Sequence, residues 1–209
     1  MTLDVTNTLQ TVPQEVTMPR RIEPRPVRLK VATPEDAGPL TVTAALAFFD
    51  DRRWMPSETL DSILAADDPS KGPPHTSYRW QKNIIEQVNG GTSPTTYYKV
   101  LLGGSLIVGG LFVVARPDLG DGQWRCEGIY VDPDYQNRGI GQEVFRQIYR
   151  LHPDVVCWSL DTPEYAVGNH HFYERMGFTH IGTSEADPAV PFRFYDYENT
   201  LSQEERLKL

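Results

Sequence analysis

Cysteine, long apolar runs and surplus positive charge are all scarce in this 209-residue sequence. The two cysteines, Cys126 and Cys157, lie in apolar, strand-like stretches, so we expect buried free thiols, and no Cys/His spacing matches a zinc site. No stretch approaches the roughly 18 apolar residues of a membrane span, and the N-terminus lacks the basic start and apolar run of a signal peptide. We therefore expect a cytoplasmic protein without a metal site or a membrane partner.

The charge balance also narrows the range of partners. Lysine and arginine number 20 against 28 aspartates and glutamates, which gives a net charge of −8. Nucleic acids and anionic membranes bind electropositive surfaces, so this balance argues against both. A cationic substrate such as an amine is compatible with it.

The length suits one domain with a sizeable core rather than two. We expect a polar, proline-rich N-terminal arm over residues 1–25, a single domain over 26–200 and a charged tail over 201–209. Within the domain, we expect residues 37–94 to form a helical insert.

Hydrophobic periodicity predicts the elements of this domain. The expected strands are 27–32, 97–102, 106–115, 124–131, 155–160, 178–182 and 192–197. The expected helices are a run through residue 49 that is interrupted at Pro39, then 58–65, 79–88, 140–151 and 168–176, with a frayed helical turn in the tail. This order predicts an α/β protein of the α+β type, with a mixed sheet.

The most informative segment is a loop between strand 124–131 and helix 140–151, with the sequence Gln136-Asn137-Arg138-Gly139-Ile140-Gly141. The first N–H groups of a helix lack intrahelical partners and carry the positive end of the helix dipole, so they suit a phosphate. The two glycines would let an anion approach the backbone, and the arginine would add positive charge. The other interpretation is a strand-to-helix turn whose glycines serve packing alone. A Rossmann site would need a third glycine in place of Val144, and a P-loop would need Gly-Lys-Ser/Thr, which is absent.

Two segments together resemble the GNAT superfamily of N-acetyltransferases. Gln136, Gly139 and Gly141 satisfy the family's acetyl-CoA-binding signature, Gln/Arg-x-x-Gly-x-Gly/Ala. Residues 169–178, Asn-His-His-Phe-Tyr-Glu-Arg-Met-Gly-Phe, are similar to the family's later helix with Phe-Tyr-Glu-Arg/Lys and x-Gly-Phe. The resemblance extends over residues 27–200 and is specific over about 97–182.

The resemblance implies an acyl-CoA N-acyltransferase fold, in which a mostly antiparallel sheet has one splayed parallel pair and helices on both faces. It implies that acetyl-CoA donates the acetyl group and that a primary amine of a small molecule attacks the thioester directly. Two other functions fit the same fold: acetylation of a protein or peptide, and non-catalytic binding of an acyl-CoA by a sensor domain. The insert at 37–94 favours a covered pocket for a small amine, and a homodimer is a further option.

The resemblance also implies a set of cofactor contacts. The pantetheine arm would meet the backbone of the strand before the loop, and the diphosphate would meet the N–H groups of the loop. The expected residues are Ile129, Tyr130, Val131, Gln136, Asn137, Arg138, Gly139, Ile140, Gly141, Gln142 and Asn169. Many relatives carry the asparagine seven residues before the helix tyrosine, where this chain has Ala166, so Asn169 is either a pantetheine ligand or a helix cap.

Two catalytic roles follow from the resemblance and from position in the sequence. Tyr173 matches the tyrosine that protonates the departing CoA thiolate, and a phenol with a pKa of about 10 can donate to a thiolate with a pKa of about 8.5. The alternative for Tyr173 is an aromatic helix residue packed on the sheet. A backbone N–H near Val131 would stabilise the oxyanion.

Glu127 is the expected general base because it stands on the strand that enters the loop. It lies two residues before Ile129, which predicts that both side chains point to the same face. The alternative is a strand glutamate that is solvated or paired with Arg125. Asp161 and His171 are reserve candidates for the base, and exposed helix positions are expected for His171 and its neighbour at 170.

Overall fold

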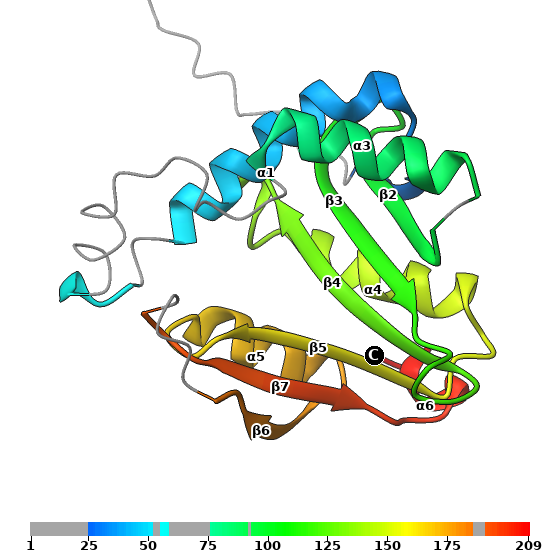
Figure 1. Ribbon diagram of the computed structural model, residues 1–209, viewed down its shortest axis with the longest axis vertical. Helices are drawn as coiled ribbons and strands as arrows, with labels where there is room; N and C mark the ends of the chain where they lie inside the picture. The colour runs from blue at the N-terminus through cyan, green and yellow to red at the C-terminus, as the bar shows by residue number, and fades with distance from the viewer. Residues whose placement is uncertain (1–24, 52–54, 59–75, 92, 186–190) are drawn as a thin grey trace, which may run out of the picture.

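The computed structural model describes residues 25–51, 55–58, 76–91, 93–185 and 191–209 (Figure 1). The expected N-terminal arm, up to residue 24, lies outside the described residues. The same holds for residues 59–65 of the expected second helix.

A seven-stranded sheet forms the centre of the molecule (Figure 1). The strands are β1 (Val27–Val31), β2 (Thr95–Leu102), β3 (Leu106–Ala115), β4 (Gln123–Val131), β5 (Cys157–Pro163), β6 (Thr179–Thr183) and β7 (Phe194–Asn199). Their spatial order is β1-β2-β3-β4-β5-β7-β6, and every neighbouring pair is antiparallel except β4 and β5. The expected mixed sheet with one parallel pair is therefore confirmed.

Helices cover both faces of the sheet, as expected. They are α1 (Ala37–Asp51), α3 (Tyr78–Asn89), α4 (Ile140–Leu151), α5 (Val167–Arg175) and α6 (Gln203–Arg206), with short 3₁₀ helices η1 (Pro34–Asp36) and η5 (Pro133–Tyr135). Figure 1 shows α1 and α3 in front of β2, β3 and β4, whereas α4 and α5 lie behind the sheet. None of the helices in the described part of the chain is long and apolar enough to cross a membrane.

The two faces carry separate apolar clusters. The α4-side core includes Leu111, Val113, Cys126, Val144, Phe145, Ile148, Trp158, Leu160 and Tyr173. The α1-side core includes Leu40, Ala44, Ile85, Tyr97, Phe112 and Tyr130. Adjacent residues of β3, Leu111 and Phe112, belong to different cores because successive side chains of a strand point to opposite faces.

Helix α1 differs from expectation at its start. It runs through Pro39 without an interruption, because this proline is the third residue of the helix. A first-turn N–H has no intrahelical acceptor, so a proline there removes no hydrogen bond. Helix α1 therefore packs on the sheet from its first turn, with Leu40, Ala44 and Ala47 buried.

The tail, expected to be a frayed turn, is anchored to the domain by a buried arginine. Arg206 of α6 has no exposed surface. Its Nη1 donates to the carbonyl of Val155 (2.6 Å), and its Nη2 donates to the carbonyls of Val156 (2.8 Å) and Asn199 (3.0 Å). Burial lowers the pKa of this guanidinium. Together with Asn199 Oδ1, which lies 3.3 Å from Nε, these acceptors tie α6 both to the turn that leads into β5 and to the end of β7.

We predict that Arg206→Ala lowers the free energy of unfolding by about 3 kcal/mol, because it leaves a cavity and unsatisfied buried carbonyls. Chemical denaturation monitored by circular dichroism measures this loss. Arg150→Ala is the control, since its side chain is 55% exposed and its ion pair with Glu143 is long, at 3.7 Å. The control is expected to change stability by less than about 0.5 kcal/mol. Equal effects of the two substitutions would contradict the anchoring role.

Candidate active site

The parallel strands β4 and β5 pair over a short stretch and then part. Their register is Gln123↔Cys157, Trp124↔Trp158 and Arg125↔Ser159, and no later residue of the two strands is paired. Beyond this point β4 stays paired with β3 and β5 stays paired with β7. Figure 1 shows the two strands diverging from this end. We call the region between the unpaired parts of β4 and β5 the fork, and its paired end the apex.

A β-bulge lies in β4 beside the apex. Gly128 is opposite Phe112 of β3, whereas Cys126 is opposite the next residue of β3, so Glu127 is the extra residue. A bulge bends its strand, which accounts for the divergence starting here. The extra residue also shifts the alternation of side chains: Cys126 and Ile129 both pack in the α4-side core. The prediction that Glu127 and Ile129 share a face is therefore wrong.

Three charged side chains meet at the apex. Arg125 Nε lies 3.3 Å from Glu127 Oε1, and Arg125 Nη2 donates to Asp161 Oδ2 at 2.5 Å. The glutamate is thus paired with the arginine, as the alternative interpretation had it, and its side chain is 39% exposed. Burial lowers the pKa of the Arg125 guanidinium, but the charges of Asp161 and Glu127 outweigh burial and raise it overall.

The glycine loop at the other end of β4 adopts a conformation suited to an anion. Asn137 and Gly139 have left-handed backbones, with φ of 58° and 76°. Such turns direct successive N–H groups into one concavity. In the described part of the chain, no backbone acceptor receives the N–H groups of residues 137–142. The Gln136 side chain fixes the loop to β4 by donating from Nε2 to the carbonyl of Val131 at 3.0 Å.

The two glycines of this loop have different reasons to be glycine. Gly139 precedes α4 with its positive φ, which a side chain rarely adopts. A Cβ on Gly141 would lie 3.0 Å from the ring of Phe172, so this glycine lets α4 approach α5. Packing thus explains Gly141, whereas backbone conformation explains Gly139. Arg138 is exposed, and its guanidinium lies 5.6 Å from the ring centroid of Tyr135.

The backbone of β4 faces the fork at alternate residues. The N–H of Asp132 donates to Val108 of β3 at 2.8 Å, so the backbone of Tyr130 also points to β3. The N–H and C=O groups of Ile129 and Val131 consequently point into the fork. The side chain of Tyr130 is buried in the α1-side core.

Tyr173 lies on α5, in the α4-side core, with 7% of its surface exposed. Its ring centroid is 5.3 Å from that of Phe172, 6.0 Å from Phe178, 6.1 Å from Tyr197 and 6.3 Å from Phe145. The ring is held on four sides by other aromatic rings. This packing gives the phenol a fixed position.

Asn169 does not cap α5. The helix begins at Val167 with Ala166 at its N-cap, so Asn169 is the third helical residue. Its Nδ2 donates to Thr162 Oγ1 on β5 at 3.3 Å. The capping alternative is therefore wrong, and the amide stands beside the β5 arm of the fork.

The two histidines of α5 lie in different surroundings. His170 is buried, contrary to expectation, because its ring stacks on Tyr195 at 4.9 Å and its Nε2 lies 3.0 Å from the carbonyl of Pro163. His171 is exposed, as expected, and its Nδ1 lies 3.6 Å from Glu174. The stacking partner comes from β7, which local periodicity on α5 could not indicate.

Both cysteines are buried free thiols, as expected. Burial raises the pKa of Cys126 to about 12 and raises that of Cys157 as well. A nucleophilic cysteine needs a lowered pKa, so neither thiol suits an acyl-enzyme. Among the described residues, no group of three or more His, Cys, Asp or Glu side chains is placed to hold a metal ion.

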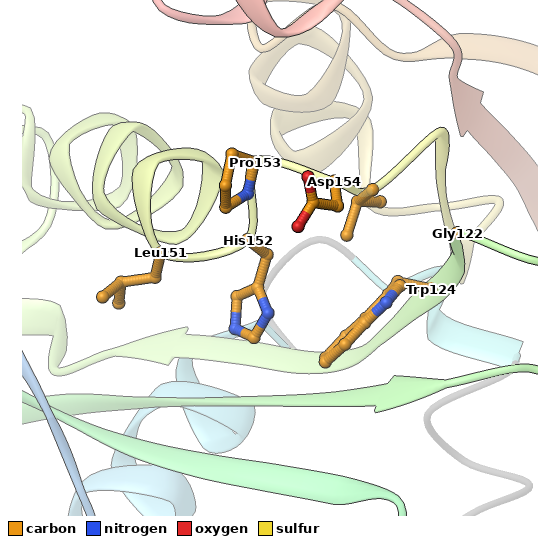
Figure 2. Close-up of a pocket in the computed structure, with 7 residues that line it drawn as sticks. Gly122, Trp124, Leu151, His152, Pro153 and Asp154 are labelled. Carbon is orange, nitrogen blue, oxygen red and sulfur yellow. The ribbon is translucent and has the colours of Figure 1, made fainter.

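A hollow of about 280 Å³ lies between the C-terminal end of α4 and the start of β4 (Figure 2). It is lined by Gly122, Trp124, Leu151, His152, Pro153, Asp154 and Val155. Residues 151–155 stand at the C-terminal end of α4, and Gly122 and Trp124 stand at the start of β4, whereas the glycine loop stands at the N-terminal end of α4. The ring of His152 packs on Trp124 at 4.3 Å, and burial lowers its pKa. This hollow therefore lies beside the apex, and no residue of the unpaired strand segments or of the glycine loop lines it.

Comparison with known proteins finds a matching domain and similar folds. The profile of the acetyltransferase (GNAT) domain matches residues 95–180. PaiA N-acetyltransferase from Thermoplasma acidophilum, solved in complex with coenzyme A, is 12% identical with a TM-score of 0.62 over 84% of this chain and 99% of its own. A chimera of the spermidine N-acetyltransferase SpeG from Vibrio cholerae and hSSAT is 10% identical, with a TM-score of 0.59 over 88% of this chain and 99% of its own.

The ribosomal L7/L12 alpha-N-protein acetyltransferase RimL is also similar in structure, with 14% identity and a TM-score of 0.57 over 84% of this chain and 90% of its own. None of the curated proteins compared matches the sequence.

The matched segment runs from the start of β2 into β6. It therefore contains both strands of the fork, the glycine loop and α5 with Tyr173. The solved structures agree with this chain in fold well beyond the segment, over 84% or more of its length. Residues 95–180 of this chain are therefore a GNAT acetyltransferase domain, the domain of a family of acyl-CoA N-acyltransferases.

Proposed function

We propose that this protein transfers the acetyl group of acetyl-CoA to a primary amine of a small molecule, by direct attack of the amine on the thioester. The observation that carries the proposal is the fork, which opens beside β4 and ends at a loop whose N–H groups lack acceptors in the described chain. The similarity to a structure solved with coenzyme A supports the choice of cosubstrate.

Acetyl-CoA would lie along β4. The backbone groups of Ile129 and Val131 would form hydrogen bonds with its pantetheine arm, which would lie beside β4 like a further strand. Tyr130, between them, would stay bonded to β3. The diphosphate would accept hydrogen bonds from the backbone N–H groups of the loop, and the charge of Arg138 would lie beside it. The residues that would donate these N–H groups are Asn137, Arg138, Gly139, Ile140, Gly141 and Gln142. Gln136 would support this site by fixing the loop, and Asn169 would bond the arm from the β5 side.

The reaction would then use two side chains on opposite faces of the sheet. Glu127 would take the proton of the attacking amine, directly or through water, since its carboxylate is partly exposed beside the apex. The N–H of Val131 would stabilise the oxyanion, and Tyr173 would protonate the departing thiolate from the α5 side. The raised pKa of the cysteines supports direct transfer.

A small amine is our preferred acceptor. Helices α1 and α3 cover the face of the sheet opposite to the core that holds Cys126 and Ile129, so an acceptor that reaches Glu127 from that face would approach under a helical cover. The net charge of −8 suits a cationic amine. The similar folds include a spermidine acetyltransferase and a protein acetyltransferase, so a peptide amine is the alternative acceptor. We further propose action in the cytoplasm, where acetyl-CoA is made and used, and we retain a homodimer as the candidate assembly.

We predict that acetyl-CoA raises the melting temperature of the purified protein and that Gly139→Val weakens its binding about tenfold or more. Valine at a positive φ strains the loop and blocks the approach of the diphosphate. Calorimetric titration gives the dissociation constants. Gly38→Ala is the matched control, because nothing lies within 4 Å of a Cβ placed there and its φ is not positive. No thermal shift at saturating acetyl-CoA would remove the whole proposal.

Tyr173→Phe is expected to lower turnover about 100-fold while the dissociation constant of acetyl-CoA changes less than about threefold, because only proton donation is lost. Release of CoA thiol with an accepted amine measures turnover. Tyr197→Phe is the control, since this tyrosine contacts the Tyr173 ring in the same core and has no role in the proposed reaction. Unchanged turnover in Tyr173→Phe would exclude it as the acid.

An amine panel separates the candidate functions. We expect CoA release with at least one small primary amine, and slower release with peptides that carry a free N-terminus or lysine. Faster release with a peptide would favour the alternative acceptor. Binding of acetyl-CoA without release in any reaction would favour a sensor domain.

A further inference from the structure

The apex of the fork is spanned by one side chain. Pairing of β4 with β5 ends at Arg125↔Ser159, and the Arg125 guanidinium continues across to Asp161 of β5, with Nη2 and Oδ2 2.5 Å apart. The same guanidinium meets Glu127 on its own strand at 3.3 Å. Arg125 is 20% exposed at its side chain, less than either carboxylate partner.

The proposed acetyl-CoA site brings the thioester to this apex. A pantetheine arm is about as long as five residues of extended strand. Counted from Val131, beside the diphosphate loop, that length reaches the bulge at Glu127. The acyl group would therefore end next to Arg125.

Only one direction remains for an acyl chain longer than acetyl. In the plane of the sheet, the paired strands close the apex. On the α4 side, Cys126, Trp158 and Leu160 are buried and packed, with 5%, 0% and 2% of their surfaces exposed. A longer chain must turn to the opposite face, where the Arg125 side chain and its two carboxylates lie.

We propose that Arg125, tethered by Asp161, closes the apex and restricts the donor to short acyl groups, an inference that rests on the proposed acetyl-CoA site. An acetyl methyl group ends before the guanidinium. Each further methylene would either push the Arg125 guanidinium away from its two carboxylates or remove water from the guanidinium without giving it a new hydrogen bond. Both changes cost binding energy. Arg125 is thus a determinant of donor specificity rather than a proton-transfer group.

The test is calorimetric titration of acetyl-, butyryl- and hexanoyl-CoA into the full chain and into Arg125→Ala. The unaltered protein is expected to bind acetyl-CoA about tenfold or more tighter than hexanoyl-CoA, since one methylene changes recognition by about tenfold or more in a restrictive pocket. In Arg125→Ala the ratio of the hexanoyl-CoA dissociation constant to the acetyl-CoA dissociation constant is expected to fall to about two or less. The reason is that the substitution frees space at the apex and hexanoyl-CoA then binds more tightly.

Arg116→Ala is the matched control. Its guanidinium pairs with Asp118 at 2.8 Å, and its side chain is 33% exposed, but the pair does not connect β4 with β5. This variant is expected to keep the ratio of the unaltered protein. Asp161→Ala is the second test variant, because it releases the arginine from β5 without removing it, and it is expected to lower the ratio even if Arg125→Ala fails to fold.

The outcomes separate this inference from the proposed function. Tight acetyl-CoA binding with the same acyl ratio in every folded Arg125 or Asp161 variant would overturn the inference alone. Equal affinity of the unaltered protein for all three acyl-CoAs would also overturn it. Absence of any acetyl-CoA binding would overturn both.

Discussion

Every feature of the candidate site depends on two parallel strands that pair over three positions and then separate. The paired end is held firmly: the N–H groups of Val156 and Cys157 both reach the carbonyl of Gly122, at 2.8 and 3.2 Å. The buried guanidinium of Arg206 fixes the same turn from the other side. Directly beyond this paired end, the extra residue in β4 bends the strand away. A rigid apex and a bent arm together expose strand backbone in the interior of a sheet, where it would normally be paired.

The site is therefore built mainly from main-chain groups, and its side chains adjust it. Val131 and Ile129 contribute backbone to the fork, and the loop contributes N–H groups whose direction is set by Asn137 and Gly139. Tyr173 differs, because it is a side chain fixed by a shell of aromatic rings on a helix. A group held this way loses little conformational entropy when it acts, which suits a proton donor.

The sequence predicted those helices and strands in which apolar residues recur at a regular spacing. Strand 106–115 and helix 140–151 are confirmed at the expected bounds, since apolar residues recur in them with the period of the element. Strand β5 begins later than expected and extends to Pro163, because β7 pairs with it there. The loop was singled out by its glycines at the start of a helix, and the Tyr173 segment was found through resemblance to the GNAT acetyltransferases, which the domain match confirms. Their roles in binding and catalysis stay predictions.

Features that depend on distant partners were not predictable in the same way. The bulge at Glu127 is defined by the register against β3, although a glycine inside a strand, Gly128, was an available signal. The burial of Arg206 depends on carbonyls about 50 residues earlier in the chain. A charged residue in a polar tail does not indicate such acceptors in the sequence, because charged side chains are usually exposed to solvent.

The place of β7 has a consequence for the order in which this domain can assemble. Strand β7 covers the edge of β5 and separates it from β6, although β7 follows both in the sequence. During synthesis on a ribosome, the backbone groups on this edge of β5 therefore stay unpaired until residues 194–199 have emerged. An open strand edge invites pairing with other chains, so the nascent protein is most vulnerable to aggregation in that interval.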